Sequence, residues 1–148
     1  MKRIIAVALA AVMMLCLASC AKNPRCTLDA AKEKIAAEES IIAYVYSDEK
    51  SFEVTKEIAE MVISGEWTEA SASKSEKVLS ITVGLQYEIC LYEDGSAMIY
   101  SGLAGLMEKD RSFYTVNNGA NAEELCKLIR ETCEVAEEVE DQGGVAVD

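Results

Sequence analysis

The sequence predicts an α+β fold, with an antiparallel sheet of about four or five strands and two to three helices packed on one face. Strand-like segments cluster between helical segments instead of alternating with them, which favours an antiparallel sheet. Asp94-Gly95 separates two β-like runs, and this dipeptide is a strong local signal for a hairpin. A chain of 148 residues is long enough for one such domain and too short for two ordinary ones.

Apolar residues recur at helical spacing in three segments of the chain. The first covers 27–39 and the second covers 52–64, where Gly65 is placed to end the helix in a left-handed conformation. The third covers 122–139, because Asn121 with a glutamate three residues later forms a variant of the capping box. The helices of the fold are expected at these three places.

Strands are expected where β-branched and aromatic residues gather, or where apolar and polar residues alternate. The segments with these patterns are 41–46, 79–83, 87–92, 96–100 and 112–116. A two-residue Asp94-Gly95 loop would pair Leu91 with Met98 on the core face and leave Tyr92 on the solvent face.

Two aromatic residues, Trp67 and Tyr92, mark the candidate interaction surface. The stretch 66–77 is the least structured part of the interior and holds Trp67, the single tryptophan of the chain. One hypothesis places this ring on an exposed binding loop. The other, which we favour for so large an apolar ring, folds it over the edge of the core.

The first 20 residues have the pattern of an export signal. Two basic residues precede an unbroken apolar run of 14 residues, 4–17, which is too short for a spanning helix of ~20 residues and suits a signal peptide. Small residues then lead to a cysteine, after which the chain turns polar. The box Leu17-Ala18-Ser19-Cys20 resembles the lipobox of bacterial lipoproteins.

This resemblance implies that Cys20 receives a diacylglycerol thioether and becomes the first residue of the mature protein. Two or three acyl chains give stable anchoring to the membrane. The protein is then expected on the extracytoplasmic side, at the outer face of the cell membrane or in an outer membrane. The expected organisation is a cleaved signal peptide at 1–19, a lipidated N-terminus and short tether at 20–26, one α+β domain at 27–139 and an acidic flexible tail at 140–148.

The charge of the chain limits its partners. The formal net charge is −12, and it becomes more negative if the basic signal peptide is removed. Binding to nucleic acid requires clustered lysine and arginine, so that partner is excluded. Attachment to anionic lipid by charge alone is excluded for the same reason. The remaining expectation is a protein partner, with a basic one fitting the charge best.

Six cysteines are present, of which Cys16 is lost with the signal peptide and Cys20 carries the lipid. An exported domain can form disulfides between the others. Cys126 and Cys133 lie seven residues apart on a predicted helix, about 10.5 Å along its axis. This distance is too long for a disulfide between them. Two complete pairings stay open, beside the alternative of free buried thiols: Cys26–Cys126 with Cys90–Cys133, and Cys26–Cys133 with Cys90–Cys126.

No catalytic, cofactor-binding or metal-binding residue is predicted. The chain contains no histidine, which removes the common catalytic triads and dyads. Ser-x-x-Lys occurs at both Ser47–Lys50 and Ser71–Lys74, and neither copy has the partner motifs of an acyl enzyme. The sequence favours a membrane-anchored, non-catalytic binding domain. The alternatives are a small hydrolase that uses carboxylates or Ser and Lys, and a structural component of the cell envelope without a small ligand.

Overall fold

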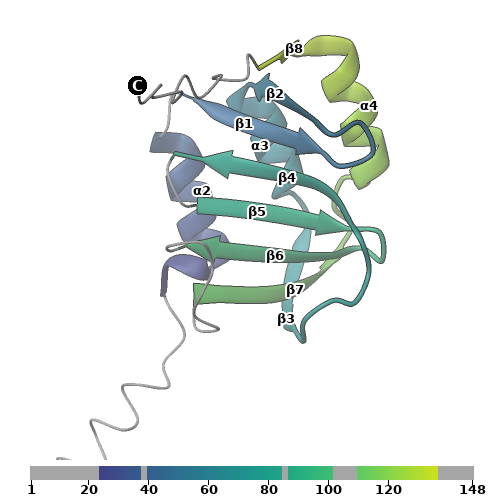
Figure 1. The fold of residues 1–148 in the computed structure, drawn as a ribbon. Coiled ribbons are helices and arrows are strands. Elements are labelled where there is room, and N and C mark those ends of the chain that lie inside the picture. The colour runs from purple at the N-terminus through teal and green to yellow at the C-terminus, as the bar shows by residue number, and fades with distance from the viewer. Residues whose placement is uncertain (1–23, 38–39, 85–86, 102–109, 137–148) are drawn as a thin grey trace, which may run out of the picture.

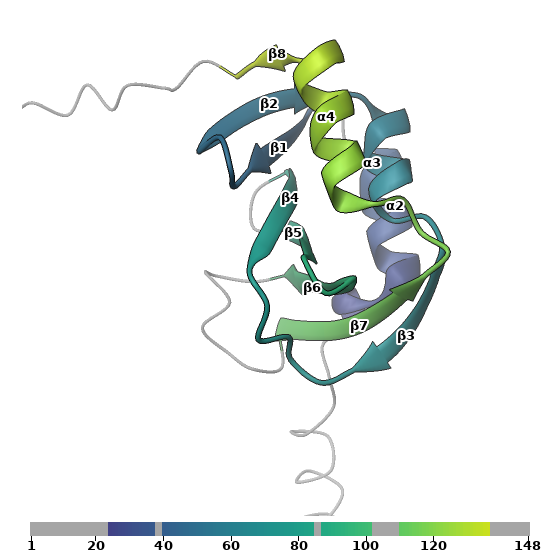
Figure 2. The same cartoon turned by 90° about the vertical axis from the view of Figure 1, so that its right-hand side faces the viewer.

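The computed structural model describes residues 24–37, 40–84, 87–101 and 110–136 of the chain. These residues form one antiparallel sheet of eight strands, with three α-helices on one face of it (Figures 1 and 2). The order of the strands across the sheet is β3-β7-β6-β5-β4-β1-β2-β8. The helical elements are η1 (Pro24–Cys26, a 3-10 turn), α2 (Leu28–Ala37), α3 (Lys56–Val62) and α4 (Ala122–Thr132). The strands are β1 (Ile41–Val45), β2 (Lys50–Val54), β3 (Glu66–Ala70), β4 (Lys77–Val83), β5 (Tyr87–Tyr92), β6 (Ser96–Ser101), β7 (Arg111–Asn117) and β8 (Glu134–Val135).

The prediction of four or five strands is wrong, because the described residues contain eight. The three strands that were missed are β2, β3 and β8. In β2, Phe52 and Val54 alternate with polar residues, but Val54 also fits the helical spacing of the residues that follow it. No residue of β3 or β8 is fully buried, so neither strand carries an apolar pattern. Each obtains its hydrogen bonds from a strand distant in sequence.

The ends of two helices also differ from the prediction. Helix α3 begins only after Thr55, whose side chain accepts a hydrogen bond from the backbone N–H of Ile58 at 3.5 Å. This cap separates the helix from β2. Helix α4 begins as predicted, since the side chain of Asn121 accepts from two backbone N–H groups of its first turn. It ends at Thr132 instead of 139, because Cys133 takes an extended conformation and leads into β8.

The register of the β5–β6 hairpin differs from the prediction by one residue. Three residues, 93–95, connect the strands, and the N–H of Gly95 donates to the carbonyl of Tyr92 at 3.2 Å. Gly95 has φ 77°, the left-handed conformation that such a three-residue loop requires. Met98 therefore lies opposite Cys90, and it faces away from the main core.

The main core lies between the helices and the sheet, and its largest fully buried apolar side chains are aliphatic. They are Ile35, Val45, Leu79, Ile81, Val83, Ile89, Ile99, Leu125 and Ile129. The longest described helix is α4, with 11 residues, and none of the helices in the described ranges is long and apolar enough to cross a membrane.

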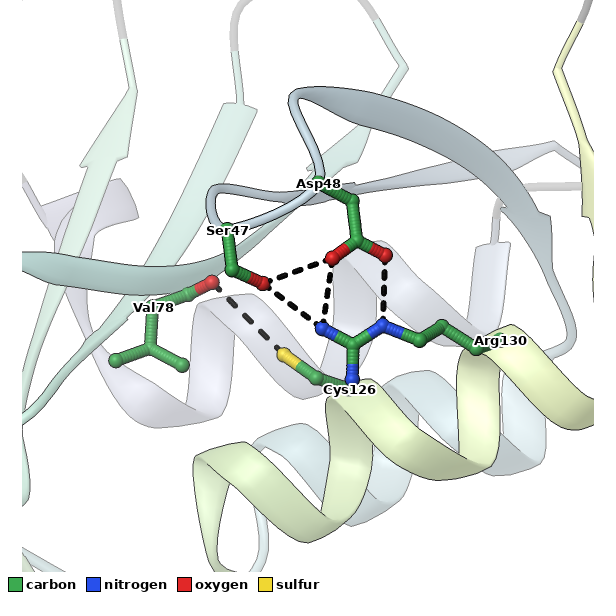
Figure 3. Close-up of polar contacts among 5 residues, drawn as sticks. All are labelled: Ser47, Asp48, Val78, Cys126 and Arg130. Atoms are coloured by element: carbon green, nitrogen blue, oxygen red, sulfur yellow. Dashed lines mark hydrogen bonds and ion pairs between the residues drawn. The ribbon is translucent and has the colours of Figure 1, made fainter.

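Helix α4 is also tied to the turn between β1 and β2 by polar contacts (Figure 3). The guanidinium of Arg130 donates from Nε to one carboxylate oxygen of Asp48 at 2.6 Å and from one terminal nitrogen to the other at 2.9 Å. The same terminal nitrogen donates to the hydroxyl of Ser47 at 2.8 Å. The hydrogen bonds from Arg130 lower the pKa of Asp48. This two-point pair holds the hairpin against the helix.

Candidate functional site

The sheet has a second face, opposite the helices, which we call the open face (Figure 2). It is formed by alternate residues of β1 and β4–β7, and the strand register arranges them in three rows across the sheet. The first row is Ile42, Thr82, Glu88, Tyr100 and Arg111. The second row is Tyr44, Ser80, Cys90, Met98 and Phe113. The third row is Tyr46, Lys77, Tyr92, Ser96 and Thr115.

The composition of the open face differs from that of the whole chain. Four of the six tyrosines lie on it, together with one methionine and one phenylalanine. The three rows contain two cations and one carboxylate, and the strand register extends the first row into β2 and β8 with two further carboxylates, Glu53 and Glu134. Protein interfaces are enriched in tyrosine, phenylalanine, methionine and arginine and depleted in lysine, serine and acidic residues. The aromatic residues, the methionine and the arginine of the open face fit this composition, whereas its lysine, serines and glutamates do not.

An apolar cluster lies at the centre of the open face. Cys90, Tyr92 and Met98 are buried there, and Tyr100 and Phe113 pack against them. Above the cluster is a hollow of about 430 Å³, within the range of small-ligand sites. It is lined by Ala72, Ser73, Lys77, Glu88, Tyr92, Met98, Tyr100, Arg111 and Phe113.

Lys77 lies beside the tyrosines of the open face. Its ammonium nitrogen is 5.9 Å from the centre of the Tyr46 ring, a cation–π distance. The ring of Tyr46 meets that of Tyr44 edge-on, with centres 4.9 Å apart. Burial acts to lower the pKa of Lys77, but nearby acidic groups, those of Cys90, Tyr46 and Glu88 among them, leave it above its ordinary value. The ammonium is therefore charged at neutral pH, and this part of the face already holds one cation against a tyrosine ring.

The thiol of Cys90 is not suited to nucleophilic chemistry. It is fully buried and donates a hydrogen bond to a carboxylate oxygen of Glu88 at 3.2 Å. Burial is the largest cause that raises its pKa far above the ordinary value, so the thiol stays protonated at neutral pH. The hydroxyl of Tyr92 contacts the sulfur of Met98 at 3.8 Å, and burial raises the pKa of this phenol. These groups act as packing and hydrogen-bonding residues.

The two aromatic residues that the sequence singled out lie on opposite faces of the sheet. Tyr92 belongs to the open face and is 8% exposed. Trp67 packs against the main core on the helix side, where its ring centre is 5.5 Å from that of Tyr114. Its indole N–H donates to the carbonyl of Ser64 at 3.0 Å. Trp67 and Tyr92 therefore do not form one patch.

The four cysteines of the described chain are all free thiols. Cys26 is buried, and its sulfur donates to the carbonyl of Asp110 at 2.9 Å. Cys126 is a buried residue of α4, and its sulfur lies 3.8 Å from the carbonyl of Val78 (Figure 3). Cys133 is partly exposed. Cys20 and Cys16 lie outside the described residues, which contain no cluster of three or more groups able to hold a metal ion.

The residues considered for hydrolysis are dispersed. Ser71 and Lys74 are exposed on the connection between β3 and β4. Ser47 and Asp48 lie in the turn between β1 and β2, where both contact Arg130. The adjacent glutamates at 38–39 and 137–138, which could serve as paired carboxylates, lie outside the described residues.

Sequence reasoning missed three members of the apolar cluster: Met98, Tyr100 and Phe113. The predicted hairpin register put Met98 on the core face. The signal that could have corrected it is Gly95 read as the third residue of the loop instead of the second. Once that register is known, the alternation along β6 and β7 identifies the other two residues.

Comparison with known proteins identifies the class of fold. No protein-family model matches the chain, and no curated protein matches its sequence. The structure resembles the crystal structure of a "putative lipoprotein" from Clostridium perfringens, with a TM-score of 0.50 and 12% sequence identity. The match covers 71% of this chain and 97% of the other. At that identity the likeness shows a shared fold.

Proposed function

We propose that this protein is a lipid-anchored, non-catalytic binding domain on the outer side of a bacterial membrane. The lipobox at the end of the signal segment supports the anchor. The similar fold of a chain described as a "putative lipoprotein" agrees with it. A domain attached in this way acts by holding a partner close to the membrane.

The open face is the binding surface in this proposal, and the apolar cluster beneath its hollow is the observation that supports it. Met98 is 7% exposed, although the helices lie on the other side of the sheet. A monomer stabilises itself by burying such residues in its main core. A second cluster with a hollow above it is typical of a surface that receives another molecule.

The partner in this proposal is a basic protein, because of the net charge of the whole chain. The strong negative charge of the chain attracts a cationic partner and speeds its encounter. At contact, tyrosine rings can receive lysine or arginine side chains, as the ring of Tyr46 receives Lys77. The hollow above Tyr92 and Met98 provides space for an apolar side chain next to those cations.

The anchor is tested by metabolic labelling with a fatty-acid precursor. We expect wild-type protein to carry label and the Cys20→Ala variant to carry none. Cys16→Ala is the matched control, because that cysteine lies in the signal segment, and its label should equal the wild-type level. Label that persists in Cys20→Ala would refute the anchor.

The binding surface is tested with a photo-crosslinking amino acid at position 100, in cells that express the full chain. Lys127 is the control position, since it is exposed on the helix side, on α4. We expect a discrete adduct with a basic protein from position 100 and none from position 127. Adding Met98→Glu should abolish the adduct. Equal adducts at both positions, or an acidic partner, would contradict the proposal.

A further inference from the structure

The first structured turn of the chain, η1, is fastened to one end of the sheet. The hydroxyl of Tyr87, at the start of β5, donates to the carbonyl of Arg25 at 2.9 Å. The hydroxyl of Tyr114 donates to the carbonyl of Cys26 at 2.7 Å. Both tyrosines are buried, and the bond from Tyr114 is itself shielded from water, whereas the bond from Tyr87 is partly buried. We call this set of contacts the N-terminal clamp.

The side chain of Cys26 adds a third attachment. It is fully buried, and its thiol donates to the carbonyl of Asp110, directly before β7. The clamp therefore joins η1 to the start of β5 and to the start of β7. In Figure 1 this turn, drawn in purple, lies at the end of the sheet from which the arrow of β5 starts.

The clamp limits the distance between the sheet and the lipid. Only four residues lie between Cys20 and Arg25, and the five residue steps that join the two span at most about 18 Å when fully extended. The first row of the open face, with Thr82 and Glu88, lies at the clamped end of the sheet. The third row, with Lys77, lies five residues further along β4, about 16 Å away.

We infer that the N-terminal clamp turns the end of the sheet where β5 begins toward the membrane. It holds the whole open face within about 35 Å of the bilayer surface. This inference rests on the proposed lipid anchor at Cys20.

The orientation is tested by energy transfer from the protein to acceptor dyes on lipid headgroups. Full-length lipidated protein is placed in vesicles, with a donor at Thr82→Cys or at Glu93→Cys. Both positions are exposed, one at the clamped end and one in the turn at the opposite end. Cys133→Ser removes the one partly exposed thiol of the described residues, and burial protects the others from labelling.

We expect a higher transfer efficiency from position 82 than from position 93. Equal efficiencies, or a higher one from position 93, would overturn the inference while leaving the anchor intact. Protein that does not associate with the vesicles would instead refute the anchor itself. The two failures are thus separable in one preparation.

A double variant tests whether the clamp is the cause. Tyr87→Phe with Tyr114→Phe removes both hydroxyl donors and loosens η1, which keeps, of the three attachments of the clamp, only the one through Cys26. We expect the difference in transfer between positions 82 and 93 to shrink, with the circular dichroism spectrum retained. Tyr100→Phe is the matched control, because its hydroxyl lies on the open face, and it should keep the wild-type difference. An undiminished difference in the folded double variant would exclude the two tyrosine hydrogen bonds as the cause.

Discussion

Gly65 lies where two connections of the chain approach each other closely. It has φ 90°, the left-handed conformation that the sequence predicted, but α3 already ends at Val62 with Ile63 as its C-cap. A Cβ atom at this position would lie 2.6 Å from the carbonyl oxygen of Asn117 and 2.6 Å from the backbone of Gly119. Real Cβ atoms do not approach backbone so closely. The substitution Gly65→Ala must therefore displace the connection between β7 and α4.

Gly95 offers a matched control for this substitution. It has φ 77°, but a Cβ atom there would meet nothing within 4 Å. Gly95→Ala should lower the free energy of unfolding by about 1–2 kcal/mol, the cost of a left-handed alanine. Gly65→Ala carries the same cost plus about 1–3 kcal/mol for the displaced backbone, or about 2–5 kcal/mol in total.

Urea unfolding of both variants measures the difference. Circular dichroism reports global unfolding, while the fluorescence of Trp67 reports the region near Gly65, since its indole N–H donates to the carbonyl of Ser64. Gly65→Ala should be less stable than Gly95→Ala by at least about 1 kcal/mol. Equal stabilities would show that the two connections do not pack as closely as the structure places them.

Three further predictions concern ionisable and reactive groups. Arg130 lowers the pKa of Asp48, so the pair stabilises the fold fully at neutral pH and less as the pH falls through that lowered pKa. Arg130→Gln should therefore flatten the acid side of the curve of melting temperature against pH. Burial raises the pKa of Cys126 to about 11 from 9.0, so the contribution of the protonated thiol to folding stability is complete below pH 9 and is lost as the pH rises toward 11. Cys126→Ala should reduce the loss of stability in that range. In native protein, iodoacetamide should modify Cys133 and spare Cys90, and only denaturant should expose Cys90, as mass spectrometry can measure. Rapid labelling of Cys90 in native protein would contradict its burial.

Local sequence signals were sufficient to predict backbone structure where a single residue decides the conformation around it. Asn121 starts α4 because its side chain occupies backbone donors that the helix leaves free. Gly65 takes a left-handed conformation that other residues adopt at a cost. The antiparallel character of the sheet, with helices packed alongside it, follows from the order of the segments along the chain.

The register of the β5–β6 hairpin depended on whether its loop contains one residue more than the Asp94-Gly95 dipeptide. The Asp94-Gly95 dipeptide identified the turn, but whether the loop has two or three residues decides which face each side chain occupies. Tertiary structure selects the longer loop here, where the carbonyl of Gly95 also accepts a hydrogen bond from the N–H of Val116 in the neighbouring strand. That choice places Met98 in the open-face cluster.

By itself the sequence predicted the export signal and the lipobox with Cys20, which stay predictions, and it predicted an antiparallel sheet with helices alongside, because each depends on local patterns along the chain. Only the tertiary structure decided the membership of β2, β3 and β8 in the sheet and the separation of Trp67 from Tyr92. It alone also placed the clamp between η1 and the start of β5. These features depend on hydrogen bonds and packing between residues far apart in sequence, for which composition and periodicity carry no signal.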